Sequence, residues 1–156
     1  MKLQEIADTI KGAYRKEELG VNVERYKELT MKSLEPISFI DDRNLVTISP
    51  VGGIPFEELT QEGDIVVSLY FPMIACYVEA EQAGYAIPHY MAIIRLRPYI
   101  NMDSRFIAQF VNSSRGREIL GKGVTSRYSI QPITVPLTYL NNIDIIKKEN
   151  ELLSSL

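Results

Sequence analysis

The chain has 156 residues, of which 46% are hydrophobic, so it is long enough for one domain with a buried core. It contains no apolar run near the roughly 18 residues of a membrane helix and no signal-peptide core at its start, so we expect a soluble, cytoplasmic protein. Its single cysteine, Cys76, excludes an internal disulfide and a multi-cysteine metal site.

The net charge of −3 argues against a general nucleic-acid binder, because non-specific affinity comes from cations that displace counterions from phosphate. The charges are unevenly distributed along the chain. Residues 1–90 carry 8 Lys/Arg against 15 Asp/Glu, whereas residues 91–128 carry 7 against 2. This basic segment also holds uncharged polar side chains, which suits phosphate contact. A solvated face that balances the acidic half is the other interpretation.

A helical repeat of apolar residues opens the chain, formed by Leu3, Ile6, Ala7 and Ile10. With Gly12 as a stop signal, this repeat predicts a short amphipathic helix. The polar stretch over residues 13–28 predicts an exposed loop, and residues 26–34 and 44–49 are strand candidates bounded by turn residues.

Three β-rich runs bounded by glycine and proline predict the central strands, over residues 64–69, 73–79 and 91–96. Asp103 can cap a helix whose apolar residues Phe106, Ile107, Phe110 and Val111 recur every three or four positions. Residues 115–120 predict a second short helix, which ends at Gly121.

Two prolines within residues 129–139 restrict that stretch to an edge strand or an extended segment. Residues 141–156 carry an apolar stripe that predicts a C-terminal helix, packed on the domain of residues 1–140 or on a partner. The order of these elements predicts an α+β fold with a twisted, mostly antiparallel sheet, flanking short helices and the C-terminal helix.

The residues that would support catalysis are sparse. The only histidine, His89, suits a structural or surface position, and Cys76 lies in an apolar run that suits a buried small hydrophobe. The carboxylate pairs at 41–42 and 57–58 suit solvated caps, and the glycines match no phosphate-binding loop. No motif for a methyl donor is present. We therefore expect a binding module without catalytic residues, metal or cofactor.

Four short motifs follow one another along nearly the whole chain. They are Leu3, Ile6, Ala7 and Gly12; Gly63, Asp64, Ile65 and Ser68; Arg97 and Pro98; and Ser113, Gly116 and Arg117. In this order and spacing the sequence resembles the target-recognition domain of type I restriction-modification specificity subunits. The resemblance implies a domain that binds one half of a split DNA target, while a modification subunit transfers the methyl group and a motor-nuclease subunit cuts.

Members of this family usually carry two such domains joined by long helices, and the proline-glutamate-glutamine start of the spacer helix is missing here. This departure leaves open a half-subunit that dimerises through the C-terminal helix, a fragment, or a relative with another partner. The partners that the resemblance implies are double-stranded DNA and the DNA methyltransferase subunit, with the restriction subunit as a further one, and no membrane.

Arginine can contact guanine or phosphate, and serine and tyrosine can contact base edges or fix register. The main DNA-contact candidates are Arg115, Arg117, Lys122, Ser126, Arg127 and Tyr128, with Arg15, Lys16, Tyr70 and Phe71 as secondary candidates. For Arg117 the other interpretation is a helix-end charge near its own carbonyl groups. For Tyr70 and Phe71 it is ordinary packing at a strand end.

Two other functions compete with DNA recognition. A protein-interaction module of the same fold would suit the acidic half and the apolar terminal helix, with DNA binding weak or lost. A small hydrolase or transferase that uses His89 and a nearby carboxylate is the enzymatic alternative. We expect strong, salt-dependent DNA binding to argue against the first, and an inert His89 substitution to exclude the second.

Overall fold

A four-stranded antiparallel sheet with strand order β1-β6-β4-β5 lies at the centre of the protein. The computed structural model describes residues 2–70, 73–121 and 135–144. The strands are β1 (Ala7–Lys11), β4 (Ile65–Ser68), β5 (Ala75–Tyr77) and β6 (Met91–Leu96). The last three confirm the predicted central strands. Every residue of β4 is buried, which explains its run of β-branched side chains without alternation.

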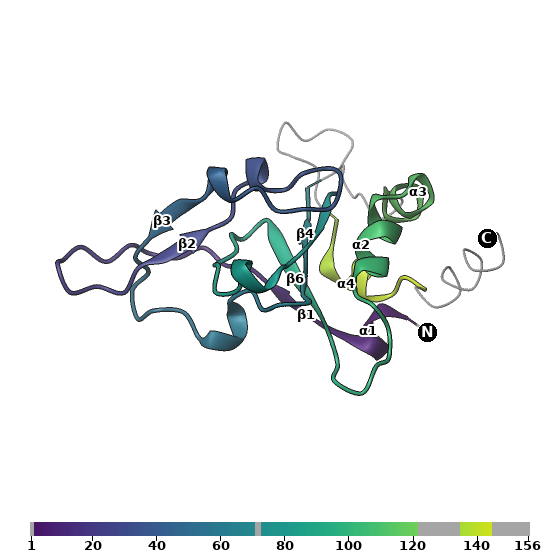
Figure 1. Ribbon diagram of the computed structural model, residues 1–156, viewed down its shortest axis with the longest axis horizontal. Coiled ribbons are helices and arrows are strands. Elements are labelled where there is room, and N and C mark those ends of the chain that lie inside the picture. The colour runs from purple at the N-terminus through teal and green to yellow at the C-terminus, as the bar shows by residue number, and fades with distance from the viewer. Residues whose placement is uncertain (1, 71–72, 122–134, 145–156) are drawn as a thin grey trace.

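A second, two-stranded antiparallel sheet joins β2 (Tyr26–Glu28) to β3 (Val46–Ile48), on the left in Figure 1. The predicted strand over 26–34 is therefore wrong after residue 28, because 31–33 form a short 3-10 helix. Two hydroxyl groups explain the change: Thr30 Oγ1 and Ser33 Oγ both donate to the carbonyl of Asn44, at 2.7 and 3.0 Å. Such local side-chain bonds compete with a strand ladder.

Four helices lie together beside the central sheet (Figure 1). They are α1 (Leu3–Ile6), α2 (Arg105–Asn112), α3 (Ser114–Gly121) and α4 (Leu137–Asn141). Helices α2 and α3 confirm the two predicted helices, and Asp103 caps the first of them by accepting a hydrogen bond from Arg105 N at 3.0 Å. The segregation of helices from strands confirms the predicted α+β class.

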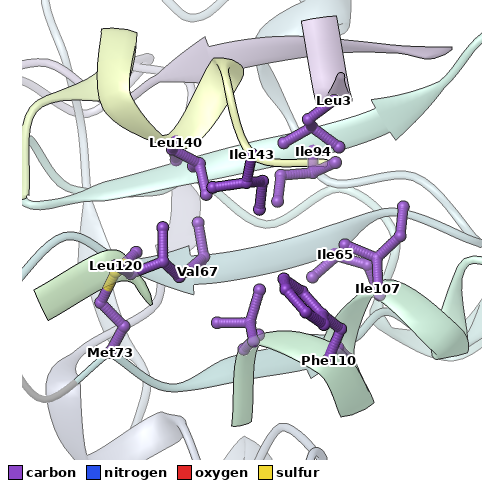
Figure 2. Packing of buried hydrophobic residues seen from close by; sticks show 14 of the residues in the cluster. Leu3, Ile65, Val67, Met73, Ile94, Ile107, Phe110, Leu120, Leu140 and Ile143 are labelled. Atoms are coloured by element: carbon purple, nitrogen blue, oxygen red, sulfur yellow. The ribbon is translucent and has the colours of Figure 1, made fainter. Parts of the chain in front are cut away.

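The side chains of β4 and β6 alternate between two hydrophobic clusters. Ile65, Val67, Ala92 and Ile94 belong to the cluster under the helices, whereas Val66, Met91 and Ile93 pack with Leu29, Leu34 and Ile40 on the other face. Figure 2 shows Ile107 and Phe110 of α2 beside Ile65, and Leu3 beside Ile94. The sheet is therefore covered by helices on one face and by residues 29–40 on the other.

The predicted N-terminal helix is correct only as far as Ile6, because Ala7–Lys11 form strand β1. Their partner is β6, in a register from Ala7 opposite Leu96 to Lys11 opposite Ala92. Gly12 follows the last residue of this strand, where the backbone passes very close to Pro88, so it does not act as a helix stop. A Cβ atom there would lie 1.9 Å from the carbonyl oxygen of Pro88.

The C-terminal region also departs from expectation. Residues 129–134 and 145–156 lie outside the described residues, but Leu137–Asn141 form helix α4 and not an extended segment. Pro136 precedes its first residue, where the missing N–H costs nothing. The expected terminal helix is wrong at 142–144, because the Ile143 carbonyl accepts from Leu3 N at 2.8 Å and Asp144 forms a bridge with Lys2.

None of the helices in the described part of the chain combines the length and the apolarity needed to span a membrane.

Candidate nucleic-acid interface

The corner between α2 and α3 is formed by the motif Ser113-x-x-Gly116-Arg117. Ser113 Oγ donates to the Phe110 carbonyl at 2.6 Å and accepts from Gly116 N at 3.0 Å, so it caps α3. Gly116 is buried, and a Cβ atom there would lie 1.9 Å from the Phe110 carbonyl oxygen. The glycine therefore allows α3 to begin directly against the end of α2.

This corner positions two of the predicted DNA contacts. Arg115 is exposed on the first turn of α3, and Arg117 is half-buried, with a buried Nε that has no hydrogen-bond partner among the described residues. The remaining main candidates, Lys122, Ser126, Arg127 and Tyr128, and the secondary candidate Phe71 lie outside the described residues. Helix α3 leads into residues 122–134, and Val135 N donates to the Leu69 carbonyl at 2.8 Å. Val135 therefore lies next to Leu69, the residue before Tyr70.

Three other arginines of the basic segment form ion pairs with acidic residues elsewhere in the fold. Arg95 pairs with Asp64 at 2.8 Å, Arg97 with Asp8 at 3.3 Å, and Arg105 with Glu79 at 3.8 Å. For residues 95–105, these pairs favour the interpretation that the basic side chains balance acidic residues and do not contact phosphate. The candidates for phosphate contact are the cations that follow, from Arg115 onward.

Arg15 is held inside the protein. Its guanidinium Nη1 donates to the Ile87 carbonyl at 2.8 Å and lies 3.5 Å from the Glu28 carboxylate, and its side chain is only 13% exposed. Burial raises the pKa of the Glu28 carboxyl, while the Arg15 charge acts in the opposite direction. Arg15 therefore anchors its loop, whereas the neighbouring Lys16 is exposed.

A row of four rings crosses the edge of the central sheet. Tyr14 stacks on His89 with centroids 3.7 Å apart, His89 meets Tyr90 edge-on at 5.1 Å, and Tyr90 stacks on Tyr70 at 5.0 Å. The last residues of β1 and β4 lie beside the first residues of β6, so the loops that carry the four rings meet at this edge. Leu69 N, for example, donates to the Tyr90 carbonyl at 2.9 Å. Tyr70 was predicted as a contact from the sequence, whereas His89 and Tyr90 were not.

Two hollows adjoin this row, with volumes of about 390 and 240 Å³, and Tyr14 and Arg15 line both. The larger also contains Lys16 and residues from 50–55, and the smaller contains His89, Tyr90 and Glu28. The described candidates thus fall into two regions: α3 with Arg115 and Arg117, and the ring row with Lys16.

Asp41, from the first of the two acidic pairs, occupies a structural position. Asp41 accepts from Arg43 N and pairs with the Arg43 guanidinium at 2.8 Å, which lowers its pKa to about 2. It caps a 3-10 helix as expected, but it is buried and not solvated. Within the described residues, no cluster of three histidine, cysteine or acidic side chains is arranged to hold a metal ion.

Burial raises the pKa of the Cys76 thiol to about 12, and the thiol donates to the Glu35 carbonyl at 3.5 Å. We expect an aromatic disulfide reagent at pH 8 to label the native protein far more slowly than the unfolded protein, because the thiolate is the nucleophile. The free energy of unfolding should also fall as the pH rises above about 9, since the unfolded chain then loses a proton that the folded chain keeps. Rapid native labelling would show that Cys76 is accessible.

A central antiparallel sheet with helices on one face defines an α+β domain. The chain is similar to the HsdS subunit from Thermoanaerobacter tengcongensis, with a TM-score of 0.62 and 12% identity over 91% of this chain and 35% of that one. It is also similar to a chain from a structure on complex assembly and conformational transition of the type I R-M system. That TM-score is 0.63, with 10% identity over 99% of this chain and 40% of the other.

No protein-family model matches the sequence, and no curated protein matches it either. The chain spans 35% and 40% of the length of the two similar chains. At these identities the likeness establishes the fold, and the resemblance inferred from the sequence is confirmed at that level.

Proposed function

We propose that this chain is a sequence-specific DNA-binding component of a type I restriction-modification system. It directs a partner DNA methyltransferase, and with it a nuclease, to one half of a DNA target in the cytoplasm, and it has no catalytic chemistry of its own. The observation that carries the proposal is the backbone likeness to an HsdS subunit over 91% of this chain.

The position of the basic residues supports the same function. Arg115 is exposed at the corner between α2 and α3, and the residues that follow α3 include Lys122 and Arg127. Cations spaced along a short stretch of sequence can contact successive phosphates, and such contacts position a protein on the duplex. Lys16, exposed beside the ring row, adds a cation in the second region.

One observation favours the second candidate function, a protein-interaction module. Leu19 and Val21 are 95% and 91% exposed in the polar loop that follows β1. Apolar side chains that gather into an exposed patch mark contacts with a protein partner, and these two lie two positions apart in one loop. This function is compatible with the same fold and predicts association without motif-directed DNA binding.

The test is co-purification of the full chain with the methyltransferase subunit encoded beside it. DNA exposed to the pair, with and without this chain, is then sequenced for methylation. We expect methylation at a defined motif only when the chain is present. Substitution of Arg115, Arg117 and Arg127 by alanine should reduce it, whereas Lys32→Ala, at an exposed cation in the 3-10 helix over residues 31–33, should not.

The possible results separate the two functions. Association without motif-directed methylation would favour the interaction module. If the two proteins do not associate and no methylated motif appears, the restriction-modification function is excluded while the fold stands.

A further inference from the structure

Tyr14 presents one bare face of an aromatic ring to solvent. Its ring lies 3.7 Å from the His89 imidazole at an interplanar angle of 18°, so one face is covered. The residue is nevertheless 83% exposed, and this exposed area therefore belongs largely to the opposite face and the ring edge. A ring face open to solvent is the geometry needed to stack on another flat ring.

The backbone on both sides of Tyr14 is anchored. Before it, Gly12 N donates to the Met91 carbonyl at 2.9 Å, and only glycine fits there against Pro88. After it, the Arg15 guanidinium bonds the Ile87 carbonyl at 2.8 Å. Behind it, His89 rests on Tyr90, which rests on Tyr70. The exposed ring is therefore held in place before any ligand arrives, which lowers the entropic cost of binding.

The chemistry around the ring favours a base over a phosphate. The smaller hollow beside Tyr14 is lined by Glu17 and Glu28 together with Arg15. Glu17 accepts from Ser49 N at 2.6 Å and Glu28 lies 3.5 Å from the Arg15 guanidinium, so that cation is already neutralised. The carboxylates repel phosphate, and their remaining lone pairs can accept hydrogen bonds from the N–H groups of a base. Its volume of about 240 Å³ lies below the roughly 300–1,000 Å³ that is usual for drug-sized ligands, so it suits a single ring system. Lys16 lines the neighbouring hollow and can contact the backbone of the same nucleotide.

We propose that the outer face of Tyr14 and the adjoining hollow form a binding site for a nucleobase that has left the stack of the DNA duplex. A base inside a duplex has both faces covered by its neighbours, so only an unstacked base can use a bare ring face. The site rests on the proposed DNA-binding function. It specifies in addition that this edge of the sheet binds DNA with an unstacked base.

The experiment compares two single strands of equal length and charge, an oligodeoxythymidylate and an abasic oligonucleotide, as ligands of the full chain. His89 is the only histidine, so the two C–H signals of its imidazole can be assigned in NMR spectra. We expect the base-containing strand to bind about 5- to 150-fold more tightly, which corresponds to the free energy of stacking one base on an aromatic ring, and to shift the His89 signals.

Tyr14→Leu should remove this difference between the strands, and Tyr14→Phe should keep it. Tyr99→Leu is the matched control, because Tyr99 is 73% exposed and lies outside the row. Equal affinity for both strands would mean phosphate contact alone and would overturn the site. Unchanged discrimination in Tyr14→Leu would overturn it as well.

Failure of the site and failure of the proposed function give different results. A chain that directs methylation to a motif but binds both strands equally keeps the function and loses the site. A chain that prefers the base-containing strand through Tyr14 but directs no methylation keeps the site and loses the function.

Discussion

Replacement of Arg95 by methionine should lower the free energy of unfolding by about 3–5 kcal/mol, because the buried Asp64 carboxylate loses its charged partner and keeps the hydrogen bond from Gln61 N at 2.8 Å. Asp64 is 3% exposed and receives two bonds from the Arg95 guanidinium, at 2.9 and 2.8 Å. The same guanidinium also bonds the carbonyls of Glu57 and Leu59 at 2.7 and 2.9 Å. Chemical denaturation of the variant and the parent measures the loss.

Arg97→Met is the matched control, because this arginine lies two positions further on and pairs with the 64%-exposed Asp8. An exposed pair of this kind contributes about 0–1 kcal/mol. Adding Asp64→Asn to Arg95→Met should recover part of the stability, since the uncompensated charge is then gone. A cost below about 1 kcal/mol for Arg95→Met alone would mean that water solvates Asp64 in the folded protein.

Gly116→Ala should destabilise the protein by about 3 kcal/mol, because the added methyl group would lie 1.9 Å from a backbone oxygen that cannot move without shifting α2. The sign of the stability change distinguishes the two possible effects of the methyl group. In an ordinary helix interior the same substitution stabilises by about 1 kcal/mol. Thermal or denaturant unfolding measures this sign. Destabilisation indicates that α2 and α3 approach closely at Gly116, and stabilisation indicates that only helix propensity matters there.

Ser114→Ala is the control in the same turn, at an exposed position, and we expect a change within about 0.5 kcal/mol. If Gly116→Ala instead stabilised the protein, the contact between α3 and the Phe110 carbonyl would be wrong. Motif-directed methylation by Gly116→Ala should also fall, because Arg115 and Arg117 lie on either side of the displaced residue.

Much of the fold could be predicted from local patterns. The three central strands were recognised because β-branched runs between glycine and proline have few alternatives. Helix α2 was recognised from its apolar stripe and from the cap at Asp103. The prediction failed at Ala7–Lys11, where helical spacing and strand burial fit the same few residues, and at Leu137–Tyr139, where two prolines suggested an extended segment.

The candidate site was less predictable. Charge counting marked residues 91–128 as basic, but Arg95, Arg97 and Arg105 pair with acids from distant parts of the chain. Arg15 was a contact candidate, yet its guanidinium is bonded inside the fold. The stacking of the rings into a row was not predicted, because Tyr14, His89 and Tyr90 come from two loops other than that of Tyr70.

The sequence by itself determined the α+β class, the scarcity of catalytic side chains and the location of the basic segment. These properties depend on composition and on neighbours a few positions apart. Only the tertiary structure decided that Ala7–Lys11 is a strand, which arginines are paired and which rings stack. Each of those outcomes is set by a partner far away in the chain: β6 for β1, Asp64 for Arg95, and His89 for Tyr14. Contact energies between such distant residues exceed local propensities of a few tenths of a kcal/mol, and local patterns contain no record of them.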